Sequence, residues 1–85
     1  SSYYLRVQAE DKPGVLGQIA NLLAAQNVSI EALIQKGVLD GHTAEIVILT
    51  HSTVEKHIKA AIAAIEALDT VGEKVVMIRM ESLHD

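Results

Sequence analysis

Hydrophobic and polar residues alternate along four segments of the chain, which is the pattern of a β-strand with one buried face. In the first segment Leu5, Val7 and Ala9 share one side, and polar residues separate them. We therefore expect strands at about residues 3–10, 28–37, 43–51 and 74–81.

The second of these segments places Ile30, Ala32 and Ile34 on one face, with Leu33 and Gln35 on the other. Between this segment and the third lies an Asp-Gly pair at residues 40–41. Because Asp-Gly tolerates the positive φ angles of a type I′ turn, the two segments are expected to form a hairpin.

Two further segments repeat their apolar residues at the spacing of an amphipathic helix. They predict helices at about residues 13–26 and 53–68. Pro13 suits the first position of a helix, and Gly17 within the helix suggests a close packing contact there. Ser52 and Glu55 match a capping box, which predicts the start of the second helix.

The resulting order, β-α-β-β-α-β, is that of a ferredoxin-like α+β sandwich. It predicts a four-stranded antiparallel sheet of order 4-1-3-2, with two helices on one face. The whole chain, residues 1–85, is interpreted as a single domain.

The third strand is apolar on both faces, because Ile46 and Ile48 lie on one and Val47 and Leu49 on the other. A sheet covered on one face only should alternate with polar residues. We therefore expect the outer face, or an edge strand, to be buried against another protomer or domain. The alternative is a scatter of exposed aliphatic residues, which is common on protein surfaces.

Composition excludes several classes of function. The 85 residues carry 7 basic and 11 acidic side chains, no cysteine and two aromatic residues. Thiolate chemistry and zinc knuckles need cysteine, and nucleic-acid binding needs clustered basic or aromatic residues. No apolar run is long enough for a membrane span, so we expect no nucleic-acid or membrane partner and a cytoplasmic location. Because it begins with Ser1 rather than Met, the chain is interpreted as processed or as a piece of a longer protein.

No catalytic or metal-binding arrangement is recognisable. The histidines His42, His51, His57 and His84 lack the helical spacing of a zinc motif, and no serine has a His and an Asp in a recognisable pattern. Acylphosphatases share the predicted fold but need an Arg in an anion-binding loop, and this chain has none in that position. We therefore expect no catalytic residues and no metal site.

One loop has chemistry of its own, because it joins the first strand to the start of the first helix. Free N–H groups and the helix dipole favour an anion such as an α-carboxylate at that position. Asp11 can hold an ammonium group beside it, so the loop could recognise both charges of an amino acid. The alternative is that Asp11 and Pro13 only start the helix.

The segment Asp11-Lys12-Pro13-Gly14-Val15-Leu16, followed by Asn27-Val28-Ser29-Ile30, resembles the ACT domain, a small regulatory module that binds amino acids. The likeness covers nearly the whole chain. A closer resemblance is to the C-terminal ACT domains of homoserine dehydrogenases, carried by segments such as Ile34-Gln35-Lys36 and Ala44-Glu45-Ile46-Val47-Ile48-Leu49-Thr50-His51.

This resemblance implies a parent enzyme that uses NADP or NAD to interconvert aspartate semialdehyde and homoserine, with no cofactor in the present piece. It implies threonine as the effector, and a homodimer or higher homo-oligomer formed through the edge strand at residues 28–37. The catalytic domains of the parent chain are then further partners. The implied effector-binding residues are Asp11, Lys12, Pro13, Gly14, Val15 and Leu16 of one protomer with Ser29 and Ile30 of the other.

Many ligand-binding members of the family carry Asn where this chain has Ser29. Serine offers one hydroxyl in place of an amide with two N–H donors and a carbonyl. The alternative function is therefore a purely structural domain that joins subunits and binds no small molecule.

Overall fold

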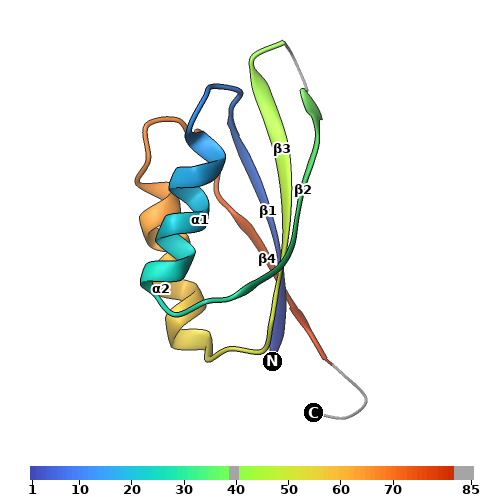
Figure 1. Ribbon diagram of the computed structural model, residues 1–85, viewed down its shortest axis with the longest axis vertical. Coiled ribbons are helices and arrows are strands. Elements are labelled where there is room, and N and C mark those ends of the chain that lie inside the picture. The colour runs from blue at the N-terminus through green and yellow to red at the C-terminus, as the bar shows by residue number, and fades with distance from the viewer. Residues whose placement is uncertain (39–40, 82–85) are drawn as a thin grey trace.

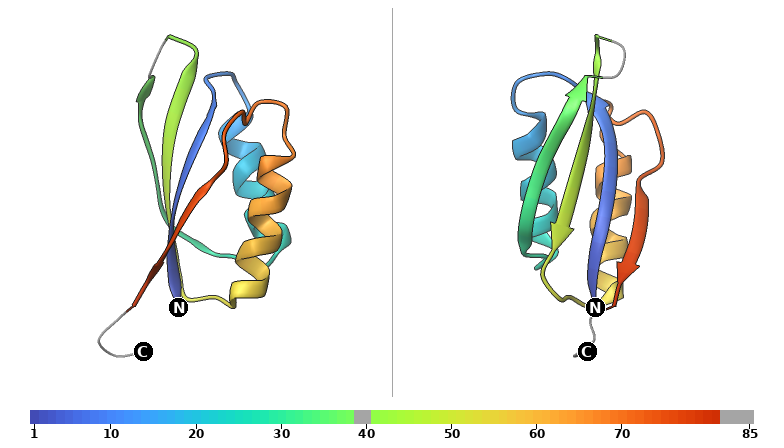
Figure 2. Two further views of the ribbon diagram at one scale, coloured as in Figure 1. Left: turned by 180° about the vertical axis from the view of Figure 1, so that it is seen from behind. Right: turned by 90° about the vertical axis from the view of Figure 1, so that its right-hand side faces the viewer.

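The computed structural model describes residues 1–38 and 41–81. Its elements are β1 (Ser2–Glu10), α1 (Val15–Ala25), β2 (Ile30–Val38), β3 (Thr43–Thr50), α2 (Glu55–Glu66) and β4 (Val76–Met80). The strands form one antiparallel sheet of order β2-β3-β1-β4, and both helices cover the same face (Figures 1 and 2). The predicted ferredoxin-like fold and strand order are confirmed.

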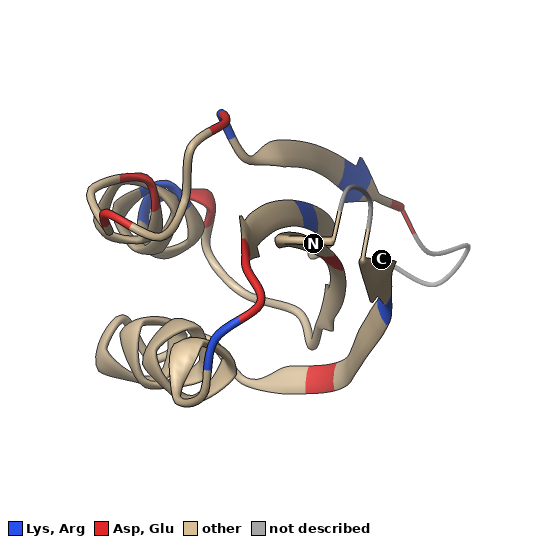
Figure 3. Cartoon of the chain, turned by 90° about the horizontal axis from the view of Figure 1, so that it is seen from above, with Lys and Arg blue, Asp and Glu red and all other residues tan. Residues whose placement is uncertain are grey.

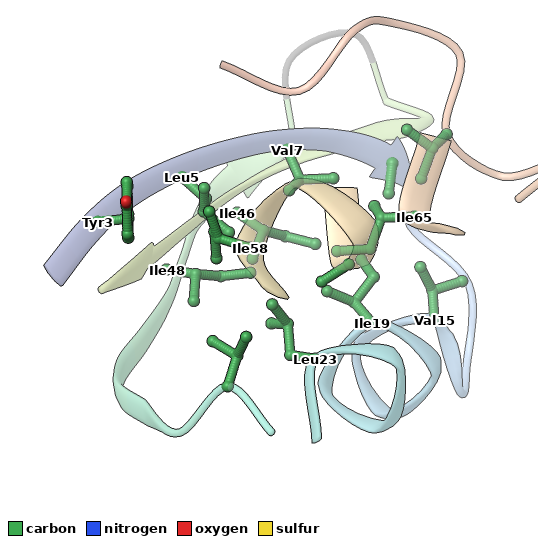
Figure 4. Close-up of a cluster of buried hydrophobic side chains, with 14 residues drawn as sticks. Tyr3, Leu5, Val7, Val15, Ile19, Leu23, Ile46, Ile48, Ile58 and Ile65 are labelled. Atoms are coloured by element: carbon green, nitrogen blue, oxygen red, sulfur yellow. The ribbon is translucent and has the colours of Figure 1, made fainter. Parts of the chain in front are cut away.

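The hydrophobic core fills the space between the two helices and one face of the sheet (Figure 4). The apolar stripes predicted for both helices point into it, so amphipathic spacing accounts for where each helix packs. Its largest fully buried apolar side chains come from β1, β3 and both helices: Tyr3, Leu5, Val7, Ile19, Leu23, Ile46, Ile48, Ile58 and Ile65.

Two bulges in β2 change the faces that simple alternation predicted for that strand. Relative to β3, one extra residue lies between Ile30 and Ala32, and another between Gln35 and Gly37. Ile30 therefore faces the helices and packs against the core, whereas Ala32 pairs with Leu49 on the outer face. The prediction that these two residues share a face is wrong, because each added residue reverses the alternation.

The predicted capping box at the start of α2 is also wrong. The helix begins at Glu55, its N-cap residue is Val54, and no side chain caps it. The carboxylate of Glu55 pairs instead with Arg79 of β4 and with Lys59 at 3.3 Å. The hydrogen bond from Arg79 is the main cause that lowers the pKa of Glu55, and Glu55 in turn raises the pKa of Arg79.

Two other expectations concern glycines. A Cβ atom added at Gly17 would meet nothing within 4 Å, so the close contact predicted there is absent within the described chain. The predicted hairpin between β2 and β3 is present, and Gly41 has a φ of +85°. Asp40 of the predicted Asp-Gly turn lies outside the described residues, as do His84 and most of the C-terminal tail.

No helix in residues 1–38 and 41–81 combines the length and the apolar character that crossing a membrane requires.

Candidate functional site

The loop between β1 and α1 is a type II β-turn followed directly by the helix. The N–H of Val15 donates to the carbonyl of Lys12 over 3.3 Å, with Pro13 and Gly14 at the two central positions. Gly14 has φ +86° and ψ −12°, the conformation that the second central residue of this turn requires. Pro13 therefore fixes the turn and is not the first residue of the helix, which begins at Val15.

Asp11 is exposed and its side chain does not cap α1. The amide of Gln35, on β2, donates to the Asp11 carboxylate over 3.4 Å. The backbone N–H of Asp11 donates to the carbonyl of His42 over 2.7 Å, which ties the loop to the residue before β3. The carboxylate is thus held at the end of the sheet and remains accessible, so starting the helix does not explain it.

The first turn of α1 presents backbone donors beside that carboxylate. The first helical hydrogen bond runs from Gln18 N–H to the carbonyl of Gly14. Within the described residues no side chain caps the helix, and the N–H of Val15 is used inside the turn. The N–H groups of Gly14, Leu16 and Gly17 make none of the backbone hydrogen bonds that tie this loop to the rest of the described chain, so they are left for an anion, and the helix dipole favours one there.

The other side chains of the loop have different surroundings. Lys12 is exposed and its ammonium lies 3.4 Å from the carboxylate of Glu10. Pro13 is exposed, whereas Val15 is buried and Leu16 packs partly against the core. The side chain of Val15 is buried and that of Leu16 is partly exposed, so both anchor the backbone of the first helical turn against the core.

Ser29 and Ile30 lie at the opposite end of α1. The helix stops in a Schellman motif, with Asn27 in the left-handed conformation at φ +60° and Val28 N–H donating to the carbonyl of Leu23 over 3.0 Å. Ser29 is exposed, and its carbonyl accepts a hydrogen bond from His51 N–H over 2.9 Å. Together with Ala20, Ala24, Asn27 and Val28, the two residues line a hollow of about 420 Å³.

A single chain does not bring the two halves of the predicted site together. Between them runs α1, whose 11 residues span about 16 Å at the usual helical rise. Residues 11–16 and residues 29–30 can therefore share one small ligand only if they come from different chains.

A second hollow of about 420 Å³ is acidic and lies beside the loop that follows α2. Its lining includes Glu10, Asp69 and Glu73. In residues 1–38 and 41–81, no group of three or more His, Cys, Asp or Glu side chains is placed to hold a metal ion.

Charged residues are distributed unevenly among the elements (Figure 3). Lys and Arg are scattered over β1, β2, α2, β4 and the loops, so they form no run along one element. Helix α1 carries no charged residue at all. Helix α1 therefore adds no charged side chain beside the turn, where Asp11 and the Lys12–Glu10 pair are the charged groups of the loop.

Gln35 is the residue of this site that sequence reasoning did not assign. Alternation placed it on the face of Leu33, which is correct, but the bond to Asp11 depends on the loop reaching the end of β2. No local pattern carries that information, because 24 residues separate the two partners along the chain.

Comparison with known proteins gives one family. The family model of the ACT domain matches residues 3–70. A homoserine dehydrogenase of Neisseria gonorrhoeae is 81% identical over 85 residues, which are 100% of this chain and 20% of that protein. The chain thus spans about a fifth of the length of this curated relative.

Solved structures are similar to this chain as well. A crystal structure of a homoserine dehydrogenase from Thiobacillus denitrificans superposes with a TM-score of 0.87 at 48% identity, covering 98% of this chain and 18% of that one. The ACT domain from GTP pyrophosphokinase of Chlorobium tepidum has a TM-score of 0.72 at 13% identity, covering 91% of this chain and 96% of that one, which is a likeness of fold alone.

Proposed function

Because the chain belongs to the ACT domain family, we propose that it is the amino-acid-sensing domain of a homoserine dehydrogenase, in the C-terminal part of that polypeptide. The similarity to homoserine dehydrogenases over the whole of this chain supports the assignment. The parent enzyme then interconverts aspartate semialdehyde and homoserine with NADP or NAD, using residues outside these 85. The domain itself contributes regulation rather than catalysis.

The proposed ligand is a free amino acid, bound by its two charged groups at the start of α1. Asp11 pairs with the ammonium group, and the N–H groups of Gly14 and Leu16 donate to the carboxylate. The single observation that carries this proposal is the exposed Asp11 carboxylate, which Gln35 holds and which does not cap the helix. Threonine, an end product of the parent pathway, is the proposed effector.

A second copy of the chain completes the site in this proposal. β2 is an edge strand, so its outer backbone groups are available to another strand. A two-fold pairing of β2 with its copy through Ile34 sets Ile30 of one chain opposite Val38 of the other. Both residues face the helices, because Ile30 pairs with Thr50 and Val38 with Ala44, so the faces of the two strands match.

This pairing relates the two halves of the site. Val38 is the last residue of β2, and it lies at the same end of the sheet as the β1–α1 loop, where Gln35 contacts Asp11. Ile30 of the second copy, with Ser29 beside it, then approaches that loop. The hydroxyl of Ser29 and the amide of Gln35 are suitable hydrogen-bond partners for the small polar side chain of threonine.

Thermal unfolding of the 85-residue chain in the presence of single amino acids tests the proposal. A ligand present at about 100 times its dissociation constant adds about 2.7 kcal/mol of stability, so L-threonine at ~10 mM should raise the unfolding temperature and most other amino acids should not. If no amino acid shifts it while the chain still dimerises, the chain is instead a structural domain that only joins subunits.

Asp11→Ala separates binding from folding. Losing a charge-assisted hydrogen bond worth about 1.5–3 kcal/mol should weaken threonine binding about tenfold to a hundredfold in isothermal titration calorimetry. Stability without ligand should change little, because Asp11 is exposed. Asp69→Ala, an exposed aspartate after α2, is the matched control and should bind normally. Equal affinity of the two variants would contradict the proposed role of Asp11.

A further inference from the structure

The hollow of about 420 Å³ at the C-terminal end of α1 has a mostly apolar lining, and we call it the α1 hollow. Its two polar lining residues are Asn27 and Ser29, which are both exposed. The other four lining residues have apolar side chains: Ala20, Ala24, Val28 and Ile30. Among side chains of this chain, a ligand in the α1 hollow can therefore form hydrogen bonds with Asn27 and Ser29 alone.

Asn27 occupies a backbone position that suits glycine better than any other residue. It follows the last turn of α1 with φ +60°, and its N–H donates to the carbonyl of Ala24 over 2.9 Å. Glycine adopts this left-handed conformation without steric cost, and asparagine is the usual substitute. Among the described residues, Asn27 is the only one with a positive φ that is not glycine. Ending the helix therefore explains the backbone at this position but gives no reason for the side chain.

The carboxamide of Asn27 is not used within the described part of the chain. Asparagine tolerates a positive φ partly because its side chain can form hydrogen bonds with nearby backbone groups. None of the side-chain hydrogen bonds of residues 1–38 and 41–81 involves Asn27. An amide offers two N–H donors and a carbonyl acceptor, whereas Ser29 offers one hydroxyl. Most of the hydrogen-bonding capacity of the α1 hollow therefore belongs to a side chain that the fold leaves unpaired.

We propose that Asn27 selects the effector by its side chain, because its carboxamide hydrogen-bonds the hydroxyl of a bound β-hydroxy amino acid. This inference rests on the proposed function, in which the β1–α1 loop of one copy binds the two charged groups and the α1 hollow of the other receives the side chain. Ala20 and Ala24 then contact the methyl group of threonine. Asp11 binds a group that all amino acids share, so Asn27 rather than Asp11 determines specificity.

Valine is the ligand that isolates this contact, because it has nearly the shape of threonine and lacks the hydroxyl. A site that hydrogen-bonds a ligand hydroxyl rejects the analogue without it, since the protein group is then left unpaired. Asn27 is exposed, so water replaces part of the lost hydrogen bond. A preference for threonine over valine of about tenfold is therefore expected, rather than the larger ratios of fully buried sites.

Isothermal titration calorimetry of the 85-residue chain and Asn27→Gly with L-threonine and L-valine tests the inference. Glycine keeps the left-handed conformation, so the variant should fold and be at least as stable as wild type, although it lacks the carboxamide. Its affinity for threonine should fall about tenfold, whereas its affinity for valine should stay the same. The variant should then no longer distinguish the two ligands. A residue that only ends the helix would leave this preference unchanged.

Asn21→Ala is the matched control, because it removes an exposed asparagine of α1 that does not line the α1 hollow, and it should keep the wild-type preference. Circular dichroism and sedimentation report whether each variant folds and keeps the wild-type mass. A wild-type preference for threonine in Asn27→Gly would overturn this inference and leave the proposed function intact. A wild-type chain that binds no amino acid would overturn both.

Discussion

Gly14 and Gly17 are three residues apart, yet the structure requires glycine at only one of these positions. Gly14 has φ +86° in the turn before α1, a conformation that costs most other residues about 1–2 kcal/mol. Gly17 lies inside α1 with ordinary helical geometry and open space around it. Backbone conformation therefore explains Gly14, and nothing within the described chain explains Gly17.

These two glycines make a matched pair of substitutions. Gly14→Ala should lower the free energy of unfolding by about 1–2 kcal/mol, because an alanine is strained at the positive φ angle of this turn. Gly17→Ala should raise it by about 1 kcal/mol, the difference in helix propensity between the two residues. Urea unfolding of dilute protein measures both changes. A destabilised Gly17→Ala variant would contradict this view and would indicate that another chain packs closely against α1.

At the same scale, sequence reasoning singled out Asp11 as a candidate but not Gln35, whose amide donates to it. The aspartate, the turn and the helix start are adjacent in the chain, so their chemistry can be read from local order. Gln35 joins them only because the β1–α1 loop reaches the end of β2. Contacts of that kind depend on the folded path of the chain.

Among the elements, β2 departs most from the pattern that its sequence suggests. The residues 28–37 alternate well, and the strand was predicted from that alternation. The two bulges, at Glu31 and Lys36, depend on pairing with β3 and reverse the faces on either side. Long strands with strict alternation, such as β1, were predicted correctly because no bulge interrupts them.

At the start of α2 the capping-box prediction failed for a different reason. Ser52 and Glu55 have the spacing of a capping box, but the helix begins at Glu55 and the carboxylate turns toward Arg79. A strand that follows 21 residues after the start of the helix competes for the same carboxylate. Arg79 offers it a full positive charge, whereas the Ser52 N–H would offer only a dipole. Tertiary structure thus overrides a local motif.

This ion pair predicts how stability depends on pH. Folding lowers the pKa of Glu55 from its ordinary value of 4.5, mainly through the hydrogen bond from Arg79. The stabilising contribution is therefore complete above pH 4.5 and is lost as the pH falls through the folded-state value. Glu55→Gln should be less stable than wild type at pH 7, and this small difference should shrink as the pH is lowered toward 3.

Thermal unfolding from pH 7 to about pH 3 measures the effect. Glu73→Gln, in the loop before β4, is the control and should keep the wild-type dependence on pH. High salt should reduce the difference between Glu55→Gln and wild type, because both partners are exposed to solvent. A difference that stays constant down to pH 3 would show that the Arg79 pair does not stabilise the fold.

For the molecule as a whole, the order of elements was enough to predict the topology. Two βαβ-like halves in 85 residues leave few alternatives to the sheet order that was found, because connections in such folds are short and do not cross. The position of the candidate site follows from that topology only in part. Residues 11–16 and Ser29 lie at opposite ends of α1, so in the proposed site they come from different chains.

The central claim is that two chains build each effector site, and mixing two defective variants tests it most directly. Asp11→Ala removes one half of the site, and Ser29→Tyr fills the other half. Each variant alone should bind L-threonine poorly while forming dimers of normal mass in sedimentation. After mixing and exchange of subunits, each mixed dimer has one site with both defects and one site with none.

Isothermal titration calorimetry of the equimolar mixture is the measurement. If sites are shared between chains, about a quarter of all sites should bind L-threonine with wild-type affinity after random exchange of subunits. If no sites recover although mixed dimers are present, each site lies within one chain, and the proposed joining of the β1–α1 loop to residues 29–30 of a second copy is wrong.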